Sequence, residues 1–249
     1  MTLDRILQSQ GFGSRRQCAQ MILSGDVLVD GVPCDDPRAD FVPDGRMLTV
    51  DGVDWRYRAH AYVALHKPAG YECSQKPQHH PSVLTLLPAE LRLRGVQCIG
   101  RLDQDTTGLL LLSDDGQFIH RYSSARRKVP KVYEVQTSEA VQPEQVASLL
   151  AGVLLEDEPQ PVVAQGCEQT GSHGLRLTLT QGKYHQVKRM VAAAGNHVAA
   201  LHRSQVGGLV LPGDLPRGAW MWLEADDLDR LADEAEDVTQ AGQGGGVAG

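Results

Sequence analysis

The spacing of apolar and polar positions at the start of the chain predicts two short helices followed by a tight hairpin. Apolar residues recur at helical spacing over residues 3–7 and again over 18–22, which is typical of helices that bury one face. Ser14 and Gln17 form the sequence pattern of a capping box, so we expect the second helix to begin there. Asp30-Gly31 lies between two short apolar runs and predicts the turn of a β-hairpin.

The chain from residue 59 onward contains more predicted strands than helices. Apolar runs, or alternating apolar and polar residues, predict strands at 62–65, 109–112, 132–135, 175–179 and 206–211. One helix is predicted from Val187 to Ala194, and Gly195-Asn196 is a typical end for it. Because strands and helices do not alternate regularly, we expect an α+β fold with a mainly antiparallel, mixed sheet flanked by helices.

These patterns divide the chain into three parts. The polar segment 54–60 is predicted to link residues 1–58, a small N-terminal α/β domain, to a larger domain over residues 59–235. Glycine, glutamine and alanine dominate the end of the chain and cannot bury enough surface to order it. Residues 236–249 are therefore expected to be a disordered, glycine-rich tail.

The composition is typical of an ordinary soluble protein. Of 249 residues, 41% are apolar and 22% are charged, and no stretch approaches the roughly 18 consecutive apolar residues of a membrane span. The N-terminus lacks a basic region followed by an apolar run, so we expect a cytoplasmic protein without a membrane partner. The five cysteines show no Cys-x-x-Cys or zinc-like spacing, and we expect no metal site.

The net charge of −7 hides two basic stretches that suit a phosphate-rich partner. Between Glu224 and Asp237 there are eight acidic residues and one basic residue, so residues 1–223 carry 23 of each sign. Residues 116–133 and 169–213 contain lysines and arginines but no acidic residue. Phosphate binding requires such local positive surface, whatever the overall charge, although a solvated basic face would leave the same pattern.

The most informative segment is a polar loop, residues 100–108, that runs directly into four leucines. It contains Arg101, Asp103 and Asp105 between two glycines, and Leu109 begins the apolar strand. A carboxylate at the edge of a core and beside an arginine is typical of a catalytic group, because burial and the cation can tune its pKa. On these residues alone, a turn in which either aspartate accepts hydrogen bonds from its own backbone explains the loop as well.

The order of these residues resembles the signature loop of pseudouridine synthases of the RsuA type. The resemblance is carried by Gly-Arg-Leu-Asp, from residue 100, and by Asp-Thr-Thr-Gly-Leu-Leu-Leu-Leu, from residue 105. It implies that Asp103 is the essential carboxylate in converting uridine to pseudouridine, a reaction without a cofactor. Arg101 is then expected to contact phosphate or to occupy the space left by a flipped base, unless it forms a structural ion pair with Asp105.

Two further motifs of the same family assign partners to Asp103. Residues 181–190, Gln-Gly-Lys-Tyr-His-Gln-Val-Lys-Arg-Met, resemble its second diagnostic stretch, which implies that Lys188 pairs with Asp103. An ionised aspartate in a closed pocket needs such a cation, because uncompensated desolvation costs several kcal/mol. Lys-Val-Tyr-Glu-Val, from Lys131, resembles the third motif and implies that Tyr133 stacks on the target base. The alternatives are a solvent-exposed lysine and an ordinary core tyrosine.

Residues 2–51 resemble the alpha-L RNA-binding domain named for ribosomal protein S-four. Leu-Asp-Arg-Ile-Leu, Gly-x-x-Ser-Arg-Arg-x-x-Ala and Gly-Asp-Val-x-Val-Asp-Gly carry this resemblance. A segment of the larger domain, His-Lys-Pro-Ala-Gly-Tyr from residue 66, resembles another stretch of RsuA-type enzymes. These resemblances and the basic stretches lead us to expect RNA contacts from Arg15, Arg16, Lys67, Lys131, Lys183, His185, Gln186 and Arg189.

Together the resemblances imply an enzyme that isomerises one uridine in the 5′ domain of 16S ribosomal RNA. The expected substrate is that RNA or a small-subunit assembly intermediate, and the protein is expected to act as a monomer. Two alternatives remain open: a non-catalytic ribosome-assembly factor with the same fold and basic surface, and a glycosidase or nucleosidase that uses Asp103 and Asp105. Analysis of the product separates the three.

Overall fold

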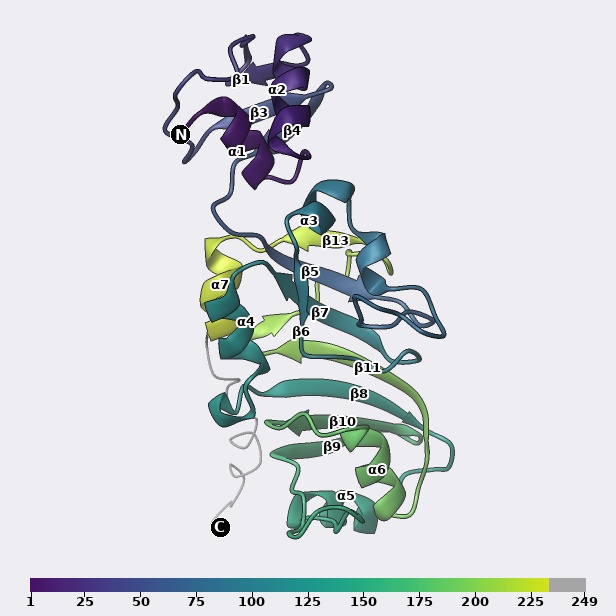
Figure 1. Ribbon diagram of the computed structural model, residues 1–249. Helices are drawn as coiled ribbons and strands as arrows, with labels where there is room; N and C mark the ends of the chain where they lie inside the picture. Colours follow the sequence, from purple (N-terminus) through teal and green to yellow (C-terminus); the bar gives the residue numbers. More distant parts are fainter. Residues whose placement is uncertain (233–249) are drawn as a thin grey trace, which may run out of the picture.

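The computed structural model describes residues 1–232, which fold into two connected units (Figure 1). The smaller, N-terminal unit packs helices α1 (Leu3–Ser9) and α2 (Arg15–Leu23) against a four-stranded antiparallel sheet. The strand order is β2-β1-β3-β4, with β1 at Val27–Val29, β2 at Val32–Pro33, β3 at Met47–Val50 and β4 at Val53–Arg56. The predicted tail, residues 236–249, lies outside the described residues.

The local signals in the N-terminal sequence are confirmed, except in the predicted linker. Ser14 and Gln17 form the capping box that starts α2. Asp30 and Gly31 have φ angles of 51° and 78°, as a two-residue hairpin turn of this type requires, and they join β1 to β2. The linker prediction is wrong for residues 54–56, which belong to β4. Only Trp55 of this strand is withdrawn from solvent, so the strand looks polar in the sequence.

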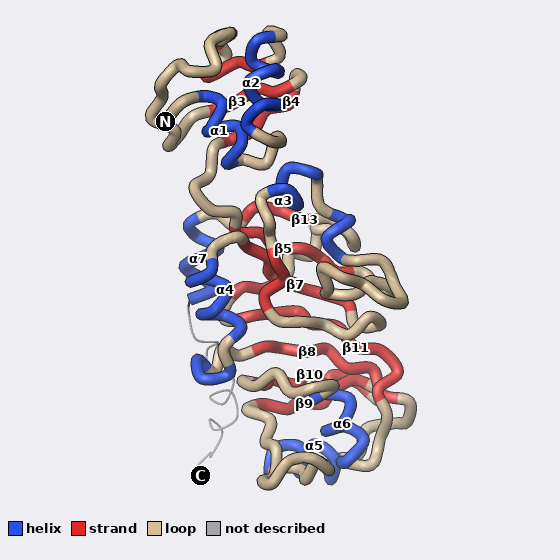
Figure 2. The backbone as a smooth tube through the Cα atoms, viewed as in Figure 1, coloured by secondary structure: helices blue, strands red, loops and turns tan. Residues whose placement is uncertain are grey.

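The larger unit is built on a mixed nine-stranded sheet (Figure 2). Its main path runs β13-β5-β7-β11-β8-β10-β9, while β6 pairs with β7 and β12 pairs with β11. The pairings are antiparallel except that of β7 with β11, which confirms the predicted α+β fold. The strands are β5 (Tyr62–Lys67), β6 (Gln97–Ile99), β7 (Thr107–Ser113), β8 (Lys131–Thr137), β9 (Gly166–Gly171), β10 (Gly174–Leu179), β11 (Val198–Val206), β12 (Leu209–Val210) and β13 (Trp220–Trp222).

Several strands extend one or two residues beyond the predicted ones, and one predicted strand is divided in two. Residues 206–211 do not form one strand, because β11 ends at Val206 and a turn through Gly207 and Gly208 leads into β12. Strand β5 runs two residues beyond the predicted 62–65, through Lys67. This extension of β5 matters, because it carries the Lys67 side chain into the core rather than into a surface loop.

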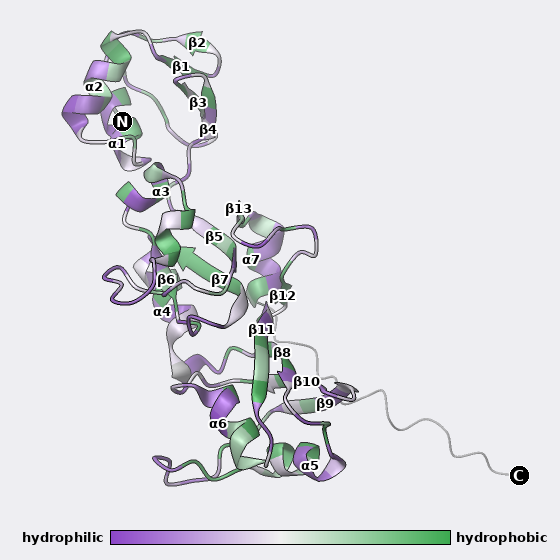
Figure 3. Ribbon diagram, turned by 90° about the vertical axis from the view of Figure 1, so that its right-hand side faces the viewer, coloured by the Kyte–Doolittle hydropathy of each residue, from purple (hydrophilic) through white to green (hydrophobic). Residues whose placement is uncertain are grey.

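Helices cover both faces of the large sheet. One face carries the larger core, under η1 (Val83–Leu86), α3 (Ala89–Leu93), α5 (Pro143–Ala151) and α6 (Gln186–Ala193). The other face packs against α4 (Gly116–Ser123), which is followed by the single turn η2 (Ala125–Arg127), and against α7 (Ala225–Ala232). Figure 3 shows the hydrophobic colour on β7 and β11, at the centre of the sheet. Within residues 1–232, every helix is too short or too polar to cross a lipid bilayer.

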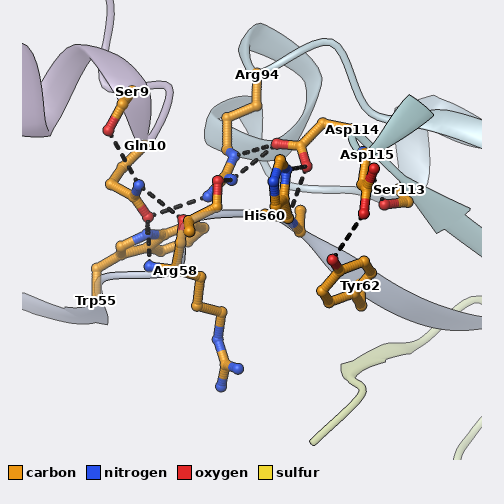
Figure 4. Close-up of polar contacts among 12 residues, drawn as sticks. Ser9, Gln10, Trp55, Arg58, His60, Tyr62, Arg94, Ser113, Asp114 and Asp115 are labelled. Carbon is orange, nitrogen blue, oxygen red and sulfur yellow. Dashed lines mark hydrogen bonds and ion pairs between the residues drawn. The ribbon is translucent and has the colours of Figure 1, made fainter. Parts of the chain in front are cut away.

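The two units meet at a polar seam centred on Gln10 (Figure 4). The Gln10 side chain is fully buried, and its Oε1 accepts hydrogen bonds from the Trp55 indole, the Arg58 backbone amide and the Arg94 guanidinium, at 3.0 to 3.3 Å. Arg94 follows α3 and lies 2.8 Å from Oδ2 of Asp114. One buried amide therefore joins the N-terminal unit, the connecting segment and the larger domain.

Close packing surrounds this seam. A side chain at Gly11, whose φ is 88°, would place its Cβ 2.0 Å from the carbonyl oxygen of Glu90, so only glycine fits there. The rings of Trp55 and Trp222 meet edge to face with centroids 5.5 Å apart. Arg58 forms an ion pair with Glu224 and lies 4.6 Å from the Trp222 ring centroid. These contacts hold the N-terminal unit in one orientation on the larger domain.

Candidate active site

The signature loop, residues 100–108, connects β6 to β7, and the Lys67 side chain holds its backbone. The Lys67 side chain is fully buried, and its Nζ donates hydrogen bonds of 2.9 to 3.2 Å to the backbone carbonyls of Pro68, Asp103, Gln104 and Thr106. The Gly70 amide donates a further bond of 2.7 Å to the Gln104 carbonyl. The loop backbone is thus fixed while the Asp103 side chain remains about a quarter exposed, at 27%.

This geometry corrects the prediction that Lys67 contacts RNA. Its ammonium has no exposed surface and its donors are used by backbone carbonyls. Burial lowers the pKa of Lys67, and nearby groups including Asp103 and Asp105 oppose that shift. The sequence contained a usable signal, because Lys67 follows Val63 and Leu65 at strand spacing and so points toward the same core.

Gly108 allows the loop to enter the sheet beside β11. A Cβ at Gly108, whose φ is 112°, would lie 2.2 Å from the carbonyl oxygen of Arg203. Gly108 and Arg203 are partners in the parallel pairing of β7 with β11. The buried Arg203 donates from Nε to the Leu109 carbonyl at 2.8 Å. The glycine of the signature string is therefore required for steric reasons.

Lys188 lies between two carboxylates of the loop. Its Nζ is 3.1 Å from Oδ2 of Asp103, as the motif implied, and 2.7 and 2.9 Å from the two oxygens of Asp105. Burial tends to lower the pKa of Lys188, but the hydrogen bonds to Asp105 and Asp103 raise it overall. Burial likewise tends to raise the pKa of Asp105, and the hydrogen bond from Lys188 lowers it overall. One cation is therefore shared by two anions, which the sequence did not predict.

His185 approaches Asp103 from the other side. Its Nε2 is 3.3 Å from Oδ1 of Asp103, and it occupies the position just before α6. The backbone of His185 has a φ of 46°, a left-handed conformation that is uncommon for histidine. Asp103 thus faces an ammonium and an imidazole, while much of its surroundings remains open to a ligand.

Comparison with known proteins gives this site a chemical class. The family model described as RNA pseudouridylate synthase matches residues 61–193, more than half of the chain. The chain belongs to this family. A second model, the S4 domain, matches residues 1–39 and so covers both helices and the hairpin of the N-terminal unit.

Curated relatives of this synthase match over nearly the full chain. It is 37% identical over 233 residues to ribosomal small subunit pseudouridine synthase A of Vibrio parahaemolyticus, covering 93% of this chain and 99% of the relative. It is 36% identical to the protein of the same name from Escherichia coli, covering 92% and 98%. A crystal structure of a pseudouridylate synthase is similar with a TM-score of 0.66 at 30% identity, covering 93% of this chain and 99% of that one.

Three other residues of this region that are predicted to contact RNA form interactions within the synthase. Gln186 is buried and its Oε1 accepts a 2.9 Å hydrogen bond from the Lys183 amide, which corrects its predicted contact with RNA. Lys183 forms an ion pair with Glu158, and Arg189 forms one with Asp157. A count of basic residues cannot reveal these pairs, because Glu158 and Asp157 lie 25 and 32 positions away from their partners in the sequence.

Tyr133 and Lys131 of β8 are more enclosed than surface contacts usually are. Tyr133 is 8% exposed and belongs to the core on the face that also includes Leu102, the neighbour of Asp103. Lys131 donates to the Val129 carbonyl at 2.9 Å. Burial, with a smaller contribution from the charge of Arg203, lowers the pKa of Lys131 to about 8.

The remaining predicted contacts lie at the surface of the synthase. Arg101 is exposed, and within residues 1–232 it forms no ion pair, because Asp105 is engaged by Lys188 instead. Arg16 is exposed at the start of α2. Its neighbour Arg15 donates from Nε to the largely buried Asp4 at 2.6 Å, so half of this pair of arginines is already bound within the protein.

Proposed function

We propose that this synthase isomerises a uridine of 16S ribosomal RNA, with Asp103 as the catalytic carboxylate. The observation that carries the proposal is the partly exposed Asp103 carboxylate beside Lys188, on a loop fixed by Lys67, in a chain of the RNA pseudouridylate synthase family. The relatives named small subunit pseudouridine synthases support the RNA of the small ribosomal subunit as substrate.

The chemistry requires little beyond a well-placed carboxylate. The bond from uracil nitrogen 1 to ribose carbon 1 breaks, the base turns, and ring carbon 5 forms the new bond, so no atoms enter or leave. Asp103 supplies the group that attacks or deprotonates near the ribose. Lys188 holds its ammonium 3.1 Å from the Asp103 carboxylate, where it offsets the desolvation that follows when RNA removes water from the site. Arg101 is free to contact phosphate or to occupy the space that the flipped uridine leaves.

Tyr133 is proposed to support the uracil from the sheet side. Its ring is 8% exposed and belongs to the same core cluster as Leu102, the neighbour of Asp103. A small exposed fraction suits a wall that limits how far the base can move after its bond breaks. We expect the largest loss when the ring is removed and little change when only its hydroxyl is removed.

The N-terminal unit is proposed to hold RNA at a fixed offset from Asp103. The S4 domain match and the exposed Arg16 support an RNA-binding surface there, and the seam at Gln10 fixes its orientation. We further propose that the protein acts as a monomer in the cytoplasm, on 16S RNA or on a small-subunit assembly intermediate.

Incubation of the purified protein with 16S transcript and with small-subunit assembly intermediates tests this function. Carbodiimide labelling followed by primer extension locates any pseudouridine, and chromatography detects released uracil. One new pseudouridine, absent with Asp103→Asn, is the expected result. Tight binding without pseudouridine on either substrate would favour a ribosome-assembly factor. Released uracil would indicate a nucleosidase.

A further inference from the structure

Tyr184 is an exposed aromatic side chain that stacks on a neighbour of the proposed catalytic group. It is 69% exposed, and it is the one aromatic residue among the exposed large hydrophobic residues of positions 1–232. Its ring stacks on the His185 imidazole, with centroids 3.8 Å apart and planes 20° from parallel. Nε2 of that imidazole lies 3.3 Å from Oδ1 of Asp103. Tyr184 is thus the outer layer of a stack whose inner layer contacts Asp103.

Hydrogen bonds within the protein hold the backbone of Tyr184 and His185 before any ligand binds. Arg189 donates to the Tyr184 carbonyl from its side chain at 3.2 Å and to the His185 carbonyl from its backbone at 3.0 Å. The buried Gln186 ties the preceding Lys183 amide down at 2.9 Å. A tyrosine held in this way loses little conformational freedom on binding, so a partner would receive most of the stacking energy.

The surroundings suit a nucleobase better than an apolar protein partner. Lys183, Lys188 and Arg189 belong to the same turn and helix start. Each is paired with a carboxylate of the protein: Lys183 with Glu158, Arg189 with Asp157, and Lys188 with Asp103 and Asp105. Phosphates of an RNA strand compete with these carboxylates for the cations, while its unpaired bases offer faces for stacking. A flat, exposed ring beside charged groups suits a base of single-stranded RNA.

We propose that Tyr184 stacks on the unpaired base of a nucleotide that flanks the target uridine. This inference rests on the proposed function and adds a contact that positions the RNA. The base is a flanking one because His185, and not Tyr184, contacts Asp103, and a base on the outer face of Tyr184 is separated from His185 by the tyrosine ring. The stack holds the strand on one side while the target nucleotide turns inward.

Equilibrium RNA binding and single-turnover kinetics test the proposal with variants at this one position. Tyr184→Leu is expected to weaken RNA binding roughly 5- to 100-fold, the range of one base–aromatic stack, and Tyr184→Phe to stay close to wild type. At saturating RNA the rate of pseudouridine formation by Tyr184→Leu should approach that of wild type, because Asp103 and Lys188 are untouched. Thermal unfolding of both variants serves as the control for folding.

RNAs with a single abasic nucleotide on either side of the target complete the test. At one flanking position, loss of the base should weaken wild-type binding as much as Tyr184→Leu does, and combining the two changes should add little. A Tyr184→Leu penalty that persists on every abasic RNA would overturn the stack, as would unchanged binding to intact RNA. If wild type binds but forms no pseudouridine, the proposed function fails, while the same binding cycle still decides the stack.

Discussion

Two polar clusters of this protein contain similar groups but differ in burial and in how many of their interactions are made within the protein. At the seam, Gln10 is fully buried and the Arg94 side chain is only 2% exposed, with each of their interactions made inside the protein. At the active site, Lys188 and Asp103 are both 27% exposed and Asp105 is 55% exposed. The seam is a completed network, whereas at the site two carboxylates share one ammonium and keep faces open to a ligand.

This difference in burial determines how much each cluster affects the stability of the fold. A buried charge or amide that loses its partner retains the full penalty of desolvation, so each seam residue depends on the others. A half-exposed ion pair contributes little to stability, because water replaces a lost partner. Mutations should therefore lower stability at the seam and activity at the site, and the following tests are ordered by the expected loss of stability.

Lys67 should affect both stability and activity, since it is buried and also holds the backbone of the active-site loop. Lys67→Met leaves the carbonyls of Pro68 and Thr106 without their donor. We expect a loss of about 2–4 kcal/mol in unfolding free energy, measured in urea, together with loss of pseudouridine formation. Lys76→Met, at an exposed lysine of the next loop, is the matched control and should change neither quantity. Normal stability of Lys67→Met would contradict the loop-holding role.

Arg94→Met tests the seam itself. It removes the partner of Asp114 and one donor to Gln10, and we expect a loss of about 2 kcal/mol in unfolding free energy. Arg92→Met, two residues earlier and exposed, should be neutral. Once folded, Arg94→Met should modify a short RNA that contains only the target loop at the wild-type rate, but full-length 16S RNA more slowly. Equal slowing on both RNAs would mean that the seam does not act through the N-terminal unit.

Lys188→Met should show the reverse pattern. We expect a change in stability below about 1 kcal/mol, because the pair is partly exposed. The single-turnover rate should fall roughly 10²-fold, as when one preorganised charge beside a reacting group is removed. Lys188→Arg, which keeps the charge, should recover part of the rate. A rate unchanged in Lys188→Met would remove Lys188 from the proposed mechanism.

The smallest expected effect is the pH dependence of the Asp105 contribution. The pKa of Asp105 in the folded protein is below its ordinary value of 3.8, so its stabilising contribution is present above that value and disappears as pH falls through the folded pKa. The difference in unfolding free energy between wild type and Asp105→Asn should be below about 1 kcal/mol, constant near neutral pH, and absent in strong acid. A difference that changes between pH 6 and 8 would point to another titrating group.

The contrast also shows which parts were readable in the sequence. The fold class, the capping box at Ser14 and the pairing of Lys188 with Asp103 follow from local patterns and ordered motifs. The burial of Gln186 does not, and that of Lys67 is indicated only by its strand spacing from Val63 and Leu65, because a charge or amide in a motif looks the same whether it faces RNA or the protein's own backbone. Such residues can be separated only once strand and helix boundaries are known to the residue.

The seam was equally hidden, for a different reason. Gln10, Arg94 and Asp114 are far apart in sequence, and none belongs to a recognisable motif. Asp114 and Asp115 follow β7 directly: Asp114 forms an ion pair with Arg94, while Asp115 caps α4 and accepts a hydrogen bond from Tyr62 at 2.8 Å. Long-range polar contacts of this kind become visible only in three dimensions.

The comparison of Asp103 with Asp105 tests the central claim most directly, because both carboxylates contact the same ammonium from the same loop. The measurement is single-turnover formation of pseudouridine in 16S RNA by Asp103→Asn and by Asp105→Asn, at saturating enzyme. We predict no detectable product with Asp103→Asn, with RNA binding retained, and a rate within about tenfold of wild type, ~1.4 kcal/mol of barrier, with Asp105→Asn. Product from Asp103→Asn at the wild-type rate, or its loss only in Asp105→Asn, would contradict the account.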